Sequence, residues 1–282
     1  MRLPVPVSAL LVSLLVLSAS AQAPPPPTSE PLHRPLDEIL DLNVRDGLVY
    51  YRALQAQRGR LDRYAASLNV APATYESWPR EARMAFWLNA YNTFVLQSVV
   101  DRYPIRGRSG EYPPSSIMQI AGVFETARHR AAGRSVTLDE IEKTILPEFK
   151  EPRLFLALGR GAIGSGRLRS EAYTADRLAS QLDAIRAEFV SDQNMIKVDR
   201  VAGRVSVTPI LSWREAQFVA AYDKGAAGPF AQRSPIERAI VGFIAPHVYP
   251  LEREFLEENT FTVTFHPFDW RLNDLTGGAP KF

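Results

Sequence analysis

The segment from Ala82 to Val100 constrains the fold more than any other part of the chain. It predicts a helix with large apolar residues on almost every side, among them Phe86, Trp87 and Phe94. A helix that is apolar all round belongs in the interior of a protein rather than on its surface. The sequence therefore predicts a buried central helix around which the rest of the chain packs.

Two asparagines, Asn89 and Asn92, lie within this apolar helix. A buried amide is costly unless its donors and acceptors are paired. One interpretation is that both side chains bond to backbone groups of a neighbouring segment, because backbone is a common partner of buried polar side chains. The other is that they line a cleft in which Trp270 supplies an apolar wall. Both interpretations can hold at once.

The first 23 residues have the layout of a secretory signal peptide: a positive charge at Arg2, an apolar run and the small-residue site Ala21-Gln22-Ala23. The apolar run is shorter than the roughly 20 residues that a membrane span requires. Residues 24–35 begin with four prolines and predict an extended tether, and residues 36–282 predict a single domain. We therefore expect a soluble, exported protein, periplasmic or secreted, without a membrane span after the signal is removed.

Helix signals outnumber strand signals in the rest of the chain. The helix signals are a capping box at Thr137, an amphipathic pattern over residues 174–190 and a capping box at Ser234. The strand signals are a hairpin pattern around Gly203 and an alternating pattern over residues 261–265. Helices and strands do not alternate regularly, which favours the α+β class. The prediction is a mostly helical single domain around the buried central helix, with a small antiparallel sheet or hairpins.

Composition excludes several classes of function. The 33 basic and 31 acidic side chains nearly balance and form no concentrated basic patch, so nucleic acid is a poor candidate partner. The chain has no cysteine, which removes disulfides, thiol catalysis and thiolate metal sites. No pair among the four histidines has the spacing of metal ligands, and we expect no metal site.

The segment Gly159–Gly164, GRGAIG, matches the G-x-G-x-x-G pattern of dinucleotide-binding proteins. That pattern requires a helix starting at its last glycine and an acidic residue after a second strand. Here a polar stretch follows instead, so no cofactor is expected. The favoured interpretation is a flexible loop whose backbone comes close to another group.

Ser165 in this loop is the candidate nucleophile of a hydrolase. Activation of a serine needs a base within hydrogen-bond reach and a group that orients the base. His266, beside Asp269, is the histidine best placed by sequence, so Ser165, His266 and Asp269 form the candidate catalytic set. The alternative is that His266 is an ordinary surface residue at the end of a strand.

Several motifs occur together in an order that resembles the domain of unknown function 547 family. They are LDEILDLNVRDGLVYYRAL, AFWLNAYNTFVLQSVVDRYPI, LDEIEKTIL, PRLFLALGRGAIGSGRLRSEAY, VSVTPILSWREAQF and FHPFDWRLND, spread over about residues 36–274. The W-x-N-A-Y-N helix and the terminal D-W-x-L-N are the most specific of these. The resemblance implies a fold but no particular activity, because the biochemical role of the family is not generally established.

The chain departs from the family pattern at polar positions. Relatives usually resemble H-F-A-L-x-C-x-x-x-S-C-P-P-L in the segment where this chain has Phe155 at the histidine, Arg160 at the first cysteine and Ser165 at the second. Lys143 stands where relatives often have histidine, and Tyr50 replaces an aspartate. The resemblance thus implies that any thiol chemistry of other members is lost here.

The residues that match the family and that we expect to form the polar skeleton or a binding pocket are Asn89, Asn92, Glu142, Arg153, Asp269, Trp270 and Asn273. The predicted function is an exported domain that binds a small molecule, a peptide or an envelope component through a catalytically degenerate site. A hydrolase using Ser165 and a non-catalytic envelope scaffold are the alternatives. If there is a shared site, the glycine-rich loop, the asparagines and the segment FDWRLN should converge on it.

Overall fold

The computed structural model describes residues 30–223 and 229–276. The predicted signal peptide, residues 1–23, lies outside the described residues, as does the first half of the predicted tether. Within the described part the chain is mostly helical, with three small sheets. This confirms the predicted α+β class.

The α-helices are α1 (Glu30–Asn43), α2 (Tyr51–Ala56), α3 (Arg58–Ser67), α4 (Pro72–Glu76), α5 (Arg80–Val100), α6 (Leu138–Glu140), α7 (Leu178–Ser191), α8 (Ile210–Trp213), α9 (Glu215–Tyr222), α10 (Pro235–Ile244) and α11 (Pro250–Glu258). The strands are β1 (Val44–Arg45), β2 (Leu48–Val49), β3 (His129–Ala131), β4 (Arg134–Val136), β5 (Ile196–Asp199), β6 (Arg204–Val207) and β7 (Thr262–Phe265). A π-helical turn, Ile141–Ile145, continues α6, and Pro152–Leu156 is a short 3₁₀ helix.

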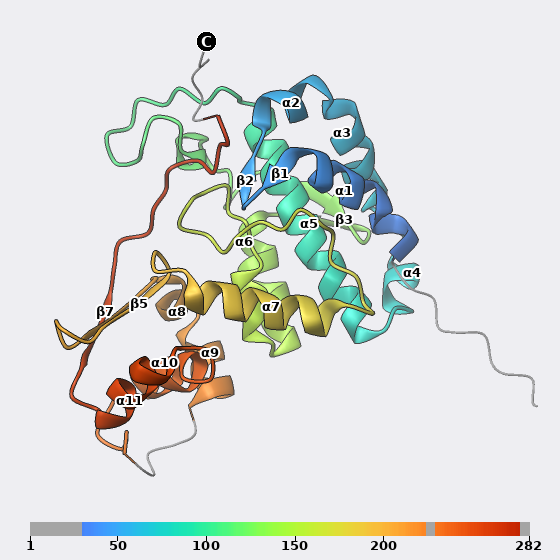
Figure 1. Cartoon of the computed structure of the whole chain (residues 1–282). Helices are drawn as coiled ribbons and strands as arrows, with labels where there is room; N and C mark the ends of the chain where they lie inside the picture. Colours follow the sequence, from blue (N-terminus) through green and yellow to red (C-terminus); the bar gives the residue numbers. More distant parts are fainter. Residues whose placement is uncertain (1–29, 224–228, 277–282) are drawn as a thin grey trace, which may run out of the picture.

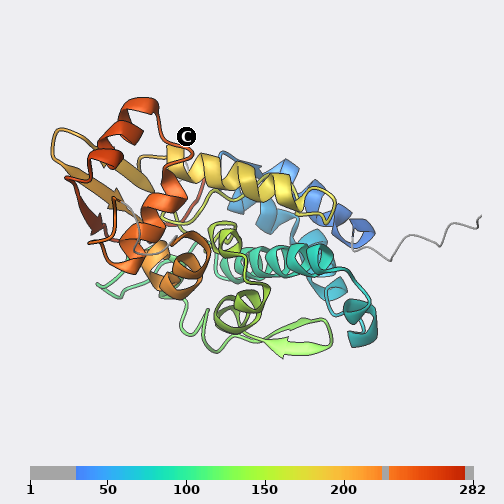
Figure 2. The ribbon, with the colours of Figure 1, turned by 90° about the horizontal axis from the view of Figure 1, so that it is seen from below.

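Helix α5 is the centre of the molecule, as its all-round apolar sequence predicts. Its buried residues lie on every side of the helix and include Phe86, Trp87 and Phe94. Helices α1, α2 and α3 pack against it, and α6 also contacts it. Helices α8 to α11 and strands β5 to β7 gather at one end of the molecule (Figures 1 and 2).

The local signals for helix ends and turns are confirmed. Thr137 and Ser234 both form capping boxes, in which each hydroxyl accepts a hydrogen bond from the backbone amide of a glutamate three residues later. The hairpin of β5 and β6 turns at Gly203, which has a φ of +61° and therefore favours glycine. Short-range chemistry is sufficient to specify these features.

The end of the chain joins distant parts of the fold. Strand β7 pairs with β6 in parallel, an addition to the antiparallel β5–β6 hairpin. The chain then runs along one edge of the molecule to the hairpin of β1 and β2 (Figure 1). There the Val49 amide donates to the Asn273 carbonyl and the Leu275 amide donates to the Val49 carbonyl, at 2.8 and 2.9 Å. The segment that begins with β7 thus connects the β5–β6 hairpin with the β1–β2 hairpin.

The second half of the predicted tether is helical rather than extended. Helix α1 begins at Glu30, and His33 is buried within it, where Nδ1 lies 2.7 Å from the Tyr64 hydroxyl. Burial lowers the pKa of His33 to about 4, although the nearby Glu30 carboxylate acts in the opposite direction. His33 is therefore a neutral core residue at physiological pH. The four prolines at the start of residues 24–35 favoured an extended structure for the whole segment, so the sequence did not predict that α1 begins at Glu30.

A membrane-spanning helix would have to be both long and strongly apolar. Within residues 30–223 and 229–276, none of the helices satisfies both conditions. The apolar length of α5 is interrupted by its two asparagines and its charged first turn.

Candidate functional site

The two asparagines of α5 bind the backbone of one irregular segment. Asn92 Nδ2 donates to the Ala157 carbonyl at 3.1 Å, and its Oδ1 accepts from the Gly159 amide at 2.8 Å. Asn89 pairs in the same two-way manner with the amide and carbonyl of Tyr173, both at 2.9 Å. The backbone interpretation is confirmed. Both side chains are buried, and neither lines the pocket that contains Trp270.

The physical reason for the asparagines lies in the segment that they hold. Residues 157–173 are mostly buried but largely without regular structure, so their peptide groups lack the partners that a helix or sheet supplies. Asn89 and Asn92 supply four of those partners from a rigid helix. The expectation of a flexible loop is therefore wrong for this segment.

The glycines of the segment lie close to other protein atoms. A Cβ on Gly166 would lie 1.8 Å from the Leu156 carbonyl oxygen, and one on Gly164 would lie 2.7 Å from the Asp269 amide nitrogen. The Gly164 amide donates to the Asp269 carbonyl at 2.8 Å. Only glycine allows these close backbone contacts. The glycine-rich loop thus bonds to Asn92 on one side and to the FDWRLN segment on the other. The asparagines themselves do not share a pocket with that segment, so the predicted convergence on one site is found only in part.

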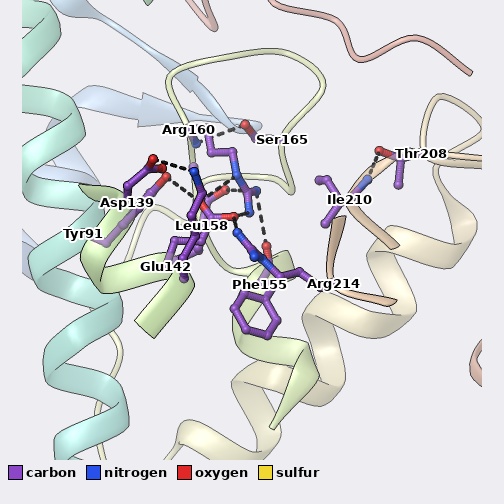
Figure 3. Close-up of polar contacts among 12 residues, drawn as sticks. Tyr91, Asp139, Glu142, Phe155, Leu158, Arg160, Ser165, Thr208, Ile210 and Arg214 are labelled. Carbon is purple, nitrogen blue, oxygen red and sulfur yellow. Dashed lines mark hydrogen bonds and ion pairs between the residues drawn. The ribbon is translucent and has the colours of Figure 1, made fainter. Parts of the chain in front are cut away.

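A buried cluster of charged side chains lies beside this segment (Figure 3). Glu142 Oε1 accepts from Arg160 Nη2 at 2.6 Å and from Arg214 Nη2 at 2.8 Å. Glu142 Oε2 accepts from Arg160 Nε at 3.2 Å and from the Tyr91 hydroxyl at 3.0 Å. An ionised carboxylate offers about four acceptor sites, so Glu142 is saturated.

Three separate elements position this cluster. Glu142 lies in the π-helical turn after α6, Arg160 follows the 3₁₀ helix Pro152–Leu156, and Arg214 lies between α8 and α9. Burial alone would raise the pKa of Glu142, but Arg160 and Arg214 outweigh it and lower that pKa to about 2. Glu142 is thus ionised near neutral pH and anchors two guanidinium groups.

An open pocket of about 390 Å³ adjoins this cluster. Glu142, Arg160 and Arg214 form its buried side, and the apolar part of its lining is Met118, Phe124, Trp213 and Trp270. The Trp213 and Trp270 rings are nearly parallel, with centroids 6.4 Å apart. Arg160 lies with its guanidinium carbon 5.9 Å from the centre of the Trp213 ring, which links the charged and aromatic parts. The pocket therefore presents charged groups on one side and apolar groups on the other.

Of the residues expected to bind, Glu142 and Trp270 line this pocket. Arg153 does not: its guanidinium is bound by Glu151 at 2.7 Å and by Asp183 at 2.5 Å. Asn273 accepts from the Tyr51 hydroxyl at 2.7 Å and donates to the Gly47 carbonyl at 3.0 Å. Arg153 and Asn273 therefore hold structural elements together.

The candidate catalytic residues form no hydrogen-bonded triad. Ser165 is buried, and its Oγ accepts from the Arg160 amide at 3.0 Å. The His266 ring lies 3.1 and 3.4 Å from the carbonyl oxygens of Pro267 and Met195, and Asp269 pairs with Arg271 at 2.5 Å. Each member is bonded to something else. The short sequence separation of His266 and Asp269 suggested an arrangement that their side chains do not adopt.

Arg214 and Trp213 are pocket residues that sequence reasoning did not identify. They lie over 50 positions from Arg160 in the chain, and the motif VSVTPILSWREAQF that contains them gives no indication that they line a pocket. A weak signal was present, because "SWRE" places an arginine and a tryptophan side by side within a helical segment. Only the tertiary structure, in which α9 packs against the 3₁₀ helix, reveals their role.

A family model described as "Protein of unknown function, DUF547" matches residues 75–190. Residues 75–190 are a DUF547 domain. The resemblance is thereby confirmed for a shorter range than the motifs suggested. No curated protein and no solved structure matches the chain. The DUF547 match includes Glu142 and Arg160, whereas Trp213, Arg214 and Trp270 lie beyond it, so the pocket is formed jointly by the DUF547 domain and the C-terminal part.

The positions at which the resemblance implies a departure from the family pattern cluster in space. Arg160 and Lys143 line the pocket, and the Arg214 guanidinium carbon lies 5.2 Å from the centre of the Phe155 ring. Ser165 accepts from the Arg160 amide at 3.0 Å. Four of the five departures thus lie in or beside one site, and the fifth, Tyr50, is exposed next to β2.

Proposed function

We propose that this DUF547 protein is a non-catalytic binding protein that takes up a small molecule in the pocket between Trp270 and the Arg160–Glu142–Arg214 cluster. The observation that carries the proposal is the state of Glu142. Its carboxylate accepts four hydrogen bonds, two of them from Arg160, and has a pKa of about 2. A saturated, permanently ionised carboxylate positions other groups but cannot exchange a proton with a substrate near neutral pH.

A binding role also accounts for the surroundings of the cluster. Ligand pockets combine apolar and aromatic walls with a few fixed polar groups, and their volumes run from about 300 to 1,000 Å³. The pocket of about 390 Å³ has this composition, since Trp213, Trp270 and Phe124 lie beside the two arginines. Its volume fits a small molecule better than a peptide or an envelope component.

A hydrolase centred on Ser165 is the weaker alternative. Ser165 Oγ is buried and accepts a hydrogen bond from a backbone amide, and neither His266 nor Asp269 is bonded to it. A serine nucleophile needs a base that removes its proton. The hypothesis of an envelope scaffold is weaker as well, because a scaffold role does not require a pocket that combines aromatic walls with buried charges.

Fragment screening by ligand-observed NMR tests the binding function. We expect hits from a library of neutral, cationic and anionic fragments, and we expect Trp213→Ala to weaken their binding about tenfold or more, as loss of an aromatic wall does. Phe265→Ala is the matched control, because Phe265 and Trp213 are both 42% exposed and Phe265 does not line the pocket. Hits that bind Trp213→Ala and Trp270→Ala as they bind the unaltered protein would contradict the proposal.

We also propose that the protein is exported, because residues 1–23 have the charged, apolar and small-residue regions of a signal peptide. Intact-mass analysis of the protein recovered from an expressing bacterium should find a mature chain that begins at Pro24. Recovery of that chain in the periplasmic or culture fraction would support the proposal. A chain that keeps Met1 and stays in the cytoplasm would contradict it.

A further inference from the structure

The buried side of the pocket carries one positive charge more than it can neutralise. Arg160 and Arg214 both bind Glu142, so two guanidinium groups share one carboxylate. Arg160 is fully buried and the Arg214 side chain is only 13% exposed. Burying a charge without a counter-charge is costly. This part of the site is therefore complementary to an anion.

The other ionisable groups of the lining do not supply the missing negative charge. Lys143 and Asp139 lie on the solvent side and pair with each other at 2.5 Å, so they neutralise one another. Glu125 is exposed. At the mouth of the pocket it would repel an anion only weakly, because water screens its charge. It would repel a doubly charged anion more strongly than a singly charged one.

Arg214 has unused capacity to bind such an anion. Its Nη2 is held by Glu142 at 2.8 Å, and its guanidinium lies over the Phe155 ring, so its orientation is fixed. Its Nε is buried and has no hydrogen-bond partner within the described residues. Because Nε itself is covered by protein atoms, the guanidinium is open to an anion only through the part that lines the pocket. A guanidinium in a fixed orientation is well suited to a planar carboxylate.

The apolar side of the pocket indicates which kind of group carries the anionic group of the ligand. Met118, Phe124, Trp213 and Trp270 form an apolar surface beside the arginines, and the whole pocket has a volume of about 390 Å³. Aromatic walls favour a flat ring or another compact apolar group. This volume is near the lower end of the range for ligand pockets, which fits a molecule with one or two rings rather than a nucleotide.

Resting on the proposed binding function, we propose that the ligand of this pocket is a small aromatic monocarboxylate. Its carboxylate accepts from the Arg214 guanidinium and neutralises the excess charge of the Arg160–Glu142–Arg214 cluster. Its ring lies against Trp270, Trp213 and Phe124. The fixed Arg214 guanidinium discriminates against the neutral amide of the same acid. The single excess positive charge and the nearby Glu125 discriminate against doubly charged phosphate monoesters.

Isothermal titration of the unaltered protein with matched probe pairs tests this ligand class. The probes are phenylacetate and indole-3-acetate, their amides phenylacetamide and indole-3-acetamide, and phenyl phosphate. We expect each carboxylate to bind about tenfold or more tightly than its amide, because a charge-assisted hydrogen bond is replaced by a neutral one. Phenyl phosphate should bind more weakly than phenylacetate because of its second charge.

Arg214→Gln is the matched variant, and it leaves Glu142 paired with Arg160. We expect the variant to lose the preference for carboxylate over amide while its affinity for the amide changes little. Arg271→Gln is the control, since Arg271 is an exposed arginine paired with Asp269 outside the pocket. Unchanged circular dichroism would show that both variants are folded.

The outcomes separate the ligand class from the binding function. If carboxylate and amide bind the unaltered protein equally, and Trp213→Ala weakens both, the pocket binds ligands but the ligand class is wrong. Tighter binding of phenyl phosphate than of phenylacetate would also overturn the monocarboxylate. If none of the probes binds and the fragment library yields no hit that depends on Trp213, both proposals fail.

Discussion

Glu142→Leu should lower the free energy of unfolding by about 3–5 kcal/mol, the usual cost of removing one partner from a buried ion pair. The reason is that the variant leaves Arg160 and Arg214 buried without their shared carboxylate and deprives the Tyr91 hydroxyl of its acceptor. Urea denaturation followed by circular dichroism measures the effect. Glu148→Leu is the control, because Glu148 is exposed and should change stability by no more than about 0.5 kcal/mol.

The double variant Glu142→Leu with Arg160→Met should recover part of the loss. It removes one of the two unpaired charges and replaces it with an apolar side chain of similar length. If Glu142→Leu unfolds at the same urea concentration as the unaltered protein, the carboxylate is not the anchor of the cluster. A double variant less stable than the single one would show that Arg160 has stabilising partners other than Glu142.

Acid should have the same effect as removing the carboxylate. The pKa of Glu142 is about 2 in the folded protein, against an ordinary value of 4.5. Its contribution to stability is therefore fully present above pH 4.5 and is lost as the pH falls towards 2. At 1.36 kcal/mol per pKa unit this contribution is about 3 kcal/mol. The stability difference between the unaltered protein and Glu142→Gln should shrink over this range, and a difference independent of pH would contradict the assignment.

Trp87→Ala and Phe94→Ala should each cost about 3–5 kcal/mol, which is a large share of the roughly 5–15 kcal/mol that stabilises a typical domain. Trp87 has an exposed fraction of 0%, and its Nε1 donates to the Tyr75 hydroxyl at 2.7 Å. Phe94 is buried and stacks on His129 with ring centroids 4.4 Å apart. Each truncation leaves a cavity that the surrounding rings cannot fill.

Denaturation midpoints and slopes of both variants measure this effect. Phe265→Ala is again the control, because its exposed ring should contribute little to stability. Equal midpoints for the unaltered protein, Trp87→Ala and Phe94→Ala would show that α5 is not the core of the fold. A changed slope would point instead to a change in the compactness of the unfolded state.

The sequence by itself determined the features that depend on neighbouring residues. The apolar surface of residues 82–100 is continuous, so we expect α5 to be buried regardless of which elements pack around it. The capping boxes at Thr137 and Ser234 close within three residues, and the hairpin turn needs only Gly203. The α+β class follows from the order of such local signals. The match to the DUF547 pattern is likewise a property of the sequence.

The tertiary structure alone decided which distant groups meet. Asn89 and Asn92 had to bond with something, but that they hold an irregular segment 65 to 84 positions further along depends on how the chain returns to α5. Ser165, His266 and Asp269 are plausible partners by residue type, yet each side chain bonds elsewhere. Arg160 and Arg214 meet at Glu142 because α9, which follows Arg214, packs against the 3₁₀ helix that precedes Arg160, and no local pattern encodes that contact. Side-chain chemistry sets what each group requires, and the path of the chain determines which group supplies it.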